Sequence, residues 1–240
     1  MIAEKIRVVH QSEQNVERSM HISPSQSRQA QIEGVGRRQF LQSMMWSLPA
    51  LALPGTVVKA GPSRDRIDDY LNHLVTRVDF RRRSSWTGTS PRRDRLVSAF
   101  RYSRVTIHHT GMQTNHHLHP KKVAADIENI MAGHRARRFG DIGYHFIVDR
   151  AGRVWEGRSL RYTGAHVSAQ NDENVGIMLL GNFENQRPSG SQIQGLYGLI
   201  HGLCNQFGIP KDLIYGHCDL GKTLCPGRYL YGYVSEMRKA

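Results

Sequence analysis

Apolar residues recur every three or four positions in four stretches of the chain, and this spacing predicts amphipathic helices. The expected helices span about residues 64–78, 120–138, 193–207 and 229–237. Pro120 suits the first turn of the second helix, because its nitrogen has no hydrogen to donate. In the third helix, Ser191 is the expected N-terminal cap and Gly208 the expected end.

Between these helices lie shorter runs with strand patterns. Strands are expected at residues 105–109, 144–148, 153–156 and 175–180, with a further short one near Ile214. Residues 149–152 supply a turn between the second and third of them. Residues 175–180 are almost continuously apolar, which is typical of a strand buried on both faces. Strands separated by helices predict an α/β fold with a central mixed β-sheet flanked by helices.

The first 60 residues have a different character. Residues 1–36 are polar, then Arg37-Arg38 precedes an apolar stretch that runs to Val58. An arginine pair before an apolar core is the signal of the twin-arginine export route, and Val58-Lys59-Ala60 suits signal cleavage. Prolines interrupt the apolar stretch, which disfavours a buried core helix and a membrane-spanning one.

We therefore expect residues 1–60 to be removed and the protein to reach the periplasm or be secreted, without a stable membrane anchor. Residues 61–102 then form a helix and a basic connecting segment, and residues 103–240 form the main domain. The chain left after this removal has the size of one ordinary domain, and we expect a monomer. The true start of translation stays open, because Met20 could also serve.

Charge narrows the class of partner only slightly. The chain has 33 Lys and Arg against 20 Asp and Glu, a formal net charge of +13. Such a charge favours anionic partners, among them nucleic acid, acidic lipid and anionic wall polymers. The basic residues are not interleaved with aromatic residues as in a base-stacking groove, so a solvated basic surface is the simpler interpretation. An exported protein is also not expected to bind nucleic acid.

Two places carry side chains that could hold a metal ion. His108 ends its expected strand, whereas His109 must point to the opposite face of the sheet. Farther along, His217 and Cys225 are eight positions apart in a segment rich in turn-forming residues. Imidazole and thiolate are both good zinc ligands, and three protein ligands plus water make a catalytic site. The spacing alone is a weak signal.

Other histidines and cysteines have simpler interpretations. His116, His117 and His119 are expected in a solvated loop, and His134 is expected to pack on the apolar side of its helix. Cys204 and Cys218 are most simply buried thiols, although a disulfide between them is an open alternative.

Six short motifs occur in an order that resembles one known family, the type 2 N-acetylmuramoyl-L-alanine amidases, which include the peptidoglycan recognition proteins and phage lysozyme amidases. They are Ile107-His108-His109-Thr110, residues 141–146 (DIGYHF), Glu156-Gly157-Arg158, Gly164-Ala165-His166, Val175-Gly176-Ile177 with Gly181-Asn182-Phe183, and the segment from Gly216-His217 to Cys225-Pro226-Gly227. Any one motif alone is weak, but together they cover about residues 80–237.

The resemblance implies a zinc amidase domain in residues 103–240. It implies one Zn²⁺ held by His108, His217 and Cys225, and active-site roles for Tyr144 and Thr223. It further suggests His166 and Arg158 as substrate-binding residues, with orientation of a loop as the alternative for His166. The implied activity is hydrolysis of the amide bond between N-acetylmuramic acid and the L-alanine of the stem peptide, with peptidoglycan or its muropeptides as the partner.

Departures from the family pattern leave parts of this open. Some relatives place a glutamate where Met178 stands and some a lysine where Thr223 stands, so no general base is assigned. Ser159-Leu160 replaces a common Gly-Trp, which leaves the preference between lysine and diaminopimelate undecided. The alternatives are a non-catalytic peptidoglycan receptor, which usually lacks a zinc ligand, and a zinc amidase that acts on another amide.

Overall fold

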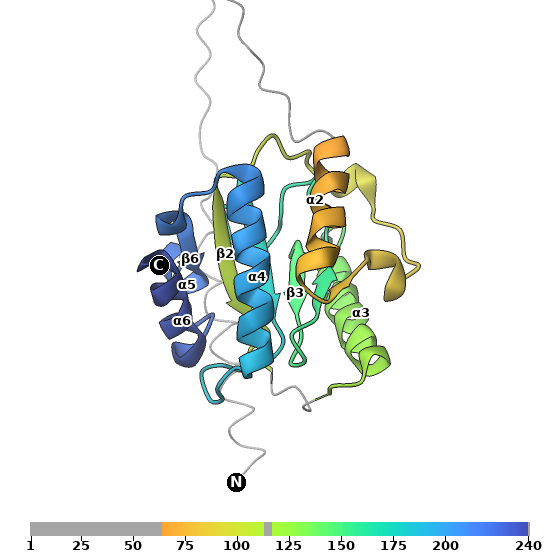
Figure 1. Ribbon diagram of the computed structural model, residues 1–240. Coiled ribbons are helices and arrows are strands. Elements are labelled where there is room, and N and C mark those ends of the chain that lie inside the picture. The colour runs from red at the N-terminus through yellow and green to blue at the C-terminus, as the bar shows by residue number, and fades with distance from the viewer. Residues whose placement is uncertain (1–63, 113–116, 240) are drawn as a thin grey trace, which may run out of the picture. The chain divides into compact units, whose positions relative to one another are not determined.

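The computed structural model describes residues 64–112 and 117–239 (Figure 1). The expected signal region and His116 lie outside these residues. The strands are β1 (Phe80–Arg81), β2 (Arg104–His109), β3 (Phe146–Val148), β4 (Val154–Glu156), β5 (Asn174–Leu179) and β6 (Ile214–Gly216). The α-helices described are α2 (Arg64–Arg77), α3 (Pro120–Ala136), α4 (Gly190–Phe207), α5 (His217–Leu220) and α6 (Arg228–Lys239). Single 3₁₀ turns lie at Arg83–Ser85, Arg93–Arg95 and Lys211–Leu213.

All six strands join one sheet, in the order β1-β4-β3-β5-β2-β6. The β3–β4 hairpin is antiparallel, and every other neighbouring pair is parallel. The predicted mixed sheet with flanking helices is therefore confirmed. The sheet includes residues from both ranges, 61–102 and 103–240, that the sequence pattern separates.

Helices cover both faces of the sheet, and the strands alternate their side chains between the two layers. On β5, Ile177 and Leu179 pack with α2, α4 and α6, while Met178 points to the opposite layer, where it packs with α3. Figure 1 shows α2 and α4 crossing one face of the sheet. All six residues of β5 are buried, as the apolar run predicts.

The N-terminal cap of α4 lies two residues earlier than the pattern predicts, and the expectation for Ser191 is wrong. The cap is Ser189, whose hydroxyl accepts a hydrogen bond from the backbone N–H of Gln192 at 3.0 Å. The Gln192 side chain in return accepts from the backbone N–H of Ser189 at 3.1 Å, which completes a capping box. Gly208 ends the helix as predicted, in the left-handed conformation with φ of 66°.

The sheet register places the metal-ligand candidates next to each other. Strand β2 pairs with β5 on one side and β6 on the other, and Ile107 faces Gly216 across the β2–β6 pair. The residues that follow this pair are His108 on β2 and His217, which is the first residue of α5. Both leave the sheet at its carboxyl edge, where sites in open α/β sheets are built.

In the part of the chain that is described, no helix combines the length and apolar character needed to cross a membrane.

Candidate metal centre and groove

The third ligand candidate reaches the sheet edge on the loop that follows α5. The backbone N–H of Cys218 donates to the carbonyl oxygen of Cys225 at 2.7 Å, which folds the loop back on itself. Gly227 lies at φ of +90°, and a Cβ there would come within 2.4 Å of the backbone carbon of Phe183. Only glycine fits both conditions, so Gly227 sets how closely the loop approaches the sheet.

His108, His217 and Cys225 come together as predicted. One ligand atom from each lies within 4.8 Å of the other two. The Nδ1 of His108 is 3.7 Å from the Sγ of Cys225. For a tetrahedral zinc ion with ordinary Zn–N and Zn–S bonds, these atoms should be about 3.6 Å apart. Two imidazoles and one thiol in this arrangement therefore suit a zinc ion with its fourth position open.

Burial controls the charge of the ligand candidates. It lowers the pKa of His108 well below its usual value and also lowers the pKa of His217, which leaves both imidazoles neutral with a free lone pair. Burial raises the pKa of the Cys225 thiol to about 12. A cation is then required to hold the sulfur as a thiolate, which is what a coordinated metal provides.

Tyr144 packs against the same centre. Its ring centroid lies 5.1 Å from that of His108 and 5.6 Å from that of His134. Burial, with a smaller contribution from Cys225, raises the pKa of the Tyr144 hydroxyl to about 12. The hydroxyl therefore keeps its proton at neutral pH and can act as a hydrogen-bond donor.

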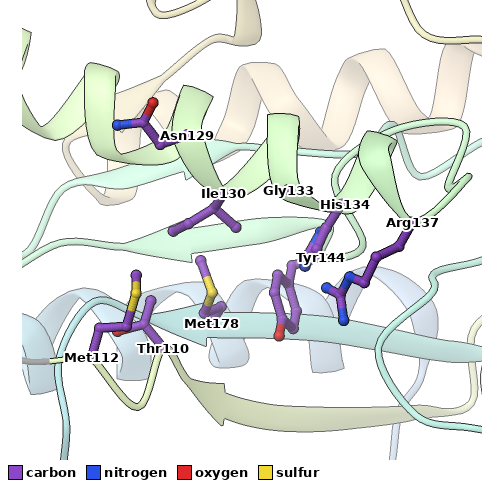
Figure 2. Close-up of a pocket in the computed structure, with 9 residues that line it drawn as sticks. All are labelled: Thr110, Met112, Asn129, Ile130, Gly133, His134, Arg137, Tyr144 and Met178. Atoms are coloured by element: carbon purple, nitrogen blue, oxygen red, sulfur yellow. The ribbon is translucent and has the colours of Figure 1, made fainter. Parts of the chain in front are cut away.

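A groove lies beside the centre, with His217 and Tyr144 on its wall. One part has a volume of about 510 Å³ and is lined by His217, His166, Tyr144 and the segment 165–169, among others. A second part of about 500 Å³ shares Tyr144, His134 and Arg137 with the first. In this second part, residues of α3 face Thr110, Met112 and Met178 across the pocket (Figure 2).

Two residues of the groove were not assigned to it from the sequence. His134 is buried as predicted, and its Nδ1 accepts from the backbone N–H of Gly143 at 2.9 Å, yet it also lines both parts of the groove. Arg137 belongs to a basic run that the pattern assigns only to the end of a helix. No signal in the sequence separates it from its neighbours.

Thr223, predicted from the resemblance to have an active-site role, and Arg158, predicted to bind substrate, differ in their surroundings. Thr223 is exposed, and its hydroxyl accepts from the backbone N–H of Cys225 at 3.1 Å, so its observed contact supports the loop. Arg158 is buried and donates to the backbone carbonyl oxygens of Ile142, Thr163 and Asp141. These bonds give Arg158 a structural role, and its contact with substrate stays a prediction.

His166 lies on the wall of the groove, but most of its ring is inside the protein. It is 9% exposed, and its Nδ1 is 3.0 Å from the Nε2 of His108. His109 points away from the centre as expected, with its Nδ1 accepting from the backbone N–H of Phe183 at 3.1 Å. His145 is fully buried and accepts from the backbone N–H of Gly176 at its Nδ1.

The cysteines outside the centre are free thiols. Cys204 and Cys218 do not form the disulfide that the sequence left open, and Cys218 is exposed, which corrects the expectation that it is buried.

Comparisons with known proteins agree with the fold. Residues 99–228 match the family model described as N-acetylmuramoyl-L-alanine amidase. A peptidoglycan-recognition protein of Drosophila simulans is 34% identical over 160 residues, which cover 65% of this chain and 84% of that protein. The structure of wild-type Drosophila PGRP-LB superposes with a TM-score of 0.59 at 26% identity, covering 65% of this chain and 92% of that one. The endolysin amidase LysCS of Clostridium intestinale shares the fold, with a TM-score of 0.54 at 24% identity over 66% of this chain and 94% of that one.

Proposed function

The chain belongs to the N-acetylmuramoyl-L-alanine amidase family, and from this premise we propose that it is a zinc-dependent hydrolase of peptidoglycan. The bond cleaved is the amide between N-acetylmuramic acid and the L-alanine of the stem peptide. The observation that carries the proposal is the complete donor set of His108, His217 and Cys225, with ligand atoms within 4.8 Å of one another and with His217 on the wall of a groove.

Tyr144 and the groove beside the donor set have separate roles in the proposed reaction. A bound zinc ion supplies Lewis-acid activation of the scissile carbonyl and of water. Tyr144 keeps its hydroxyl hydrogen, because burial raises its pKa to about 12, and it donates to the carbonyl oxygen as negative charge develops there. The groove positions the sugar and peptide on either side of the amide, and it is long enough to have two parts that meet at Tyr144.

Proton transfer to the leaving amine does not use a carboxylate of the groove. Among the described residues that line its two parts, none is an aspartate or a glutamate. We propose that the proton passes through the attacking water and the Tyr144 hydroxyl.

A peptidoglycan receptor is the second candidate function. It is favoured by the name of the matched Drosophila relative, which is a peptidoglycan-recognition protein. Both functions share the groove and the partner, and they differ in whether the amide is cleaved.

Replacement of Cys225 by Ser tests the amidase directly. The purified variant should lose zinc and stop releasing stem peptides from cell-wall peptidoglycan, whereas Cys218→Ser, at an exposed cysteine of α5, should retain both. Full hydrolysis by Cys225→Ser would overturn the proposal. Binding of muropeptides by the wild-type, zinc-loaded protein without release of any stem peptide would favour the receptor.

We propose further that the protein works as a monomer after export by the twin-arginine route. The support is the Arg37-Arg38 pair and the apolar stretch that follows it. Replacement of both arginines by lysine should leave the protein in the cytoplasmic fraction, and size-exclusion chromatography with light scattering should give the mass of one chain. Export of the lysine variant at wild-type yield would contradict this route.

A further inference from the structure

We propose that His166 is a positioning residue, which holds His108 in the tautomer that presents its Nδ1 to the metal. The inference rests on the proposed function only in taking zinc as the metal. It concerns how the protein prepares a ligand before any metal or substrate arrives.

The backbone carbonyl oxygen of Asn174 can only accept a hydrogen bond, and this fixes the direction of the hydrogen bonds made by His166 and His108. The Nε2 of His166 is 3.2 Å from the backbone carbonyl oxygen of Asn174, so this nitrogen must carry the hydrogen. In a neutral ring the Nδ1 of His166 is then an acceptor. It lies 3.0 Å from the Nε2 of His108, which must therefore be the donor.

This leaves the Nδ1 of His108 without a hydrogen, and it faces the ligand sulfur. Its distance of 3.7 Å from the Sγ of Cys225 is close to the value of about 3.6 Å for two ligands of a tetrahedral zinc ion. Metal-bound histidines usually donate their other ring N–H to a carboxylate or a carbonyl oxygen. Here the Nδ1 of His166 accepts the hydrogen bond from His108, and the Nε2 of His166 donates to the backbone carbonyl oxygen of Asn174.

Two glycines make the slot in which the His166 ring lies. A Cβ added at Gly164 would come within 2.4 Å of the Cδ2 of His166, and one added at Gly176 would come equally close. Each glycine therefore allows a contact that an alanine would prevent. Since Gly176 is on β5, next to β2, the slot fixes the ring against the sheet that carries His108.

The backbone of His166 is fixed as well. The side-chain oxygen of Asn171 accepts from the backbone N–H groups of His166 and Val167, at 2.8 and 2.9 Å. The Asn174 side chain accepts from the Thr106 hydroxyl on β2 at 2.9 Å, so the carbonyl that ends the relay is anchored to the strand of His108. Ring, backbone and final acceptor are all held before a ligand binds.

The tautomer can be read without metal or substrate. Long-range ¹H–¹⁵N NMR of the metal-free full chain, with ¹⁵N-labelled histidine, should show His108 and His166 each protonated at Nε2. His108 is assigned by the signal that disappears in His108→Gln. A wild-type His108 protonated at Nδ1 would overturn the proposal.

Zinc affinity, measured by competition with a chromogenic chelator, tests the consequence. His166→Leu should show both His108 tautomers and bind zinc about 10- to 100-fold more weakly. His166→Gln, whose side-chain oxygen can accept from His108, should recover part of that affinity. Wild-type affinity in a folded His166→Leu protein would overturn the proposal, as would a Gln variant no better than Leu.

A glycine variant gives a test that leaves every histidine in place. Gly176→Ala should weaken zinc binding, because its Cβ displaces the His166 ring, whereas Gly232→Ala on α6, where a Cβ meets open space, should not. An unchanged zinc affinity of Gly176→Ala would overturn the proposed role of this glycine in holding the His166 ring. None of these measurements uses peptidoglycan, so they can succeed even if wall hydrolysis fails, and the reverse.

Discussion

The backbone N–H of His109 donates a hydrogen bond to the Sγ of Cys225 over 3.4 Å, although the two residues are 116 positions apart. Strand β2 thus gives the candidate centre both a ligand, His108, and a donor that stabilises the sulfur of another ligand. A slip of β2 by one residue would remove both at once, because it would turn every side chain of the strand to the other face.

Loss of the Tyr144 hydroxyl should slow the proposed reaction without removing the metal. We expect Tyr144→Phe to lower kcat about 10²- to 10³-fold, because one donor to the developing oxyanion is lost. Zinc content should stay at the wild-type level, since the residue is not among the three ligands. Tyr197→Phe, on the surface of α4, is the matched control and should keep full activity. Equal rates for the two variants would remove Tyr144 from the mechanism.

Acid should destabilise the metal-free protein because buried histidines resist protonation. Burial lowers the pKa of His145 to about 3 and that of His134 to about 4, against about 6.5 in the unfolded chain. Above pH 6.5 both states are neutral and the effect is absent. Below it the unfolded chain binds protons that the folded one does not, so the free energy of unfolding falls by up to about 1.4 kcal/mol per pH unit for each histidine.

Urea unfolding of the metal-free protein between pH 6.5 and 5 measures how the free energy of unfolding changes with pH. This range lies above the pH at which most carboxylates titrate. His145→Gln should flatten this pH dependence, and His201→Gln, at an exposed position of α4, should not. A wild-type protein equally stable across this range would contradict the prediction.

The pair of Asp149 and Arg153, whose side chains are 0% and 9% exposed, should be highly sensitive to substitution. Asp149 is fully buried and accepts from the Nε of Arg153 at 2.6 Å and from the indole N–H of Trp155 at 2.8 Å. Asp149→Ala would leave the Arg153 charge buried and unpaired, at a cost of about 3–5 kcal/mol in the free energy of unfolding.

Chemical denaturation checks this against Asp94→Ala, whose side chain is 76% exposed beside Arg95. That control should change stability by less than about 0.5 kcal/mol. Similar losses in both variants would mean that burial does not distinguish the two pairs.

Ser189 is the observed N-terminal cap of α4, and Ser191 is the cap that the sequence predicts. Ser189→Ala removes the hydroxyl that accepts from Gln192, and we expect a loss of about 1 kcal/mol. Ser191→Ala is the matched control, because Ser191 is exposed within the first turn, and its effect should stay within about 0.5 kcal/mol. The midpoints of urea denaturation compare the two directly. A larger loss at Ser191 would restore the sequence-based cap.

Elements with a strong local pattern were predictable, and those made by distant pairing were not. The apolar run at 175–180 and Pro120 in the first turn of α3 point to structure through their own neighbours. By contrast, β1 is two residues long and exists because Phe80 and Arg81 pair with β4. Helix α5 has four residues, and the side chain of Asp219 stabilises its start by accepting from the backbone N–H of Gly216 at 2.8 Å.

The candidate site divides in the same way. Ligand identity follows from the chemistry of His108, His217 and Cys225 and from the family motifs that contain them. The relation between His108 and His166 does not, because it depends on two glycines whose missing Cβ atoms matter only once β2 and β5 are paired. Arg158 shows the opposite case, since its motif suggests a substrate contact while its hydrogen bonds run to three backbone carbonyls.

The sheet described above terminates in β1 at one side and β6 at the other, strands of only two and three residues. Helix α6 packs against β6. A long, exposed edge strand can pair with a strand of a second molecule, and such pairing can start aggregation. Both edge strands of the described sheet are short, and α6 covers one of them. We therefore expect little edge-to-edge aggregation of this fold, even at high protein concentration.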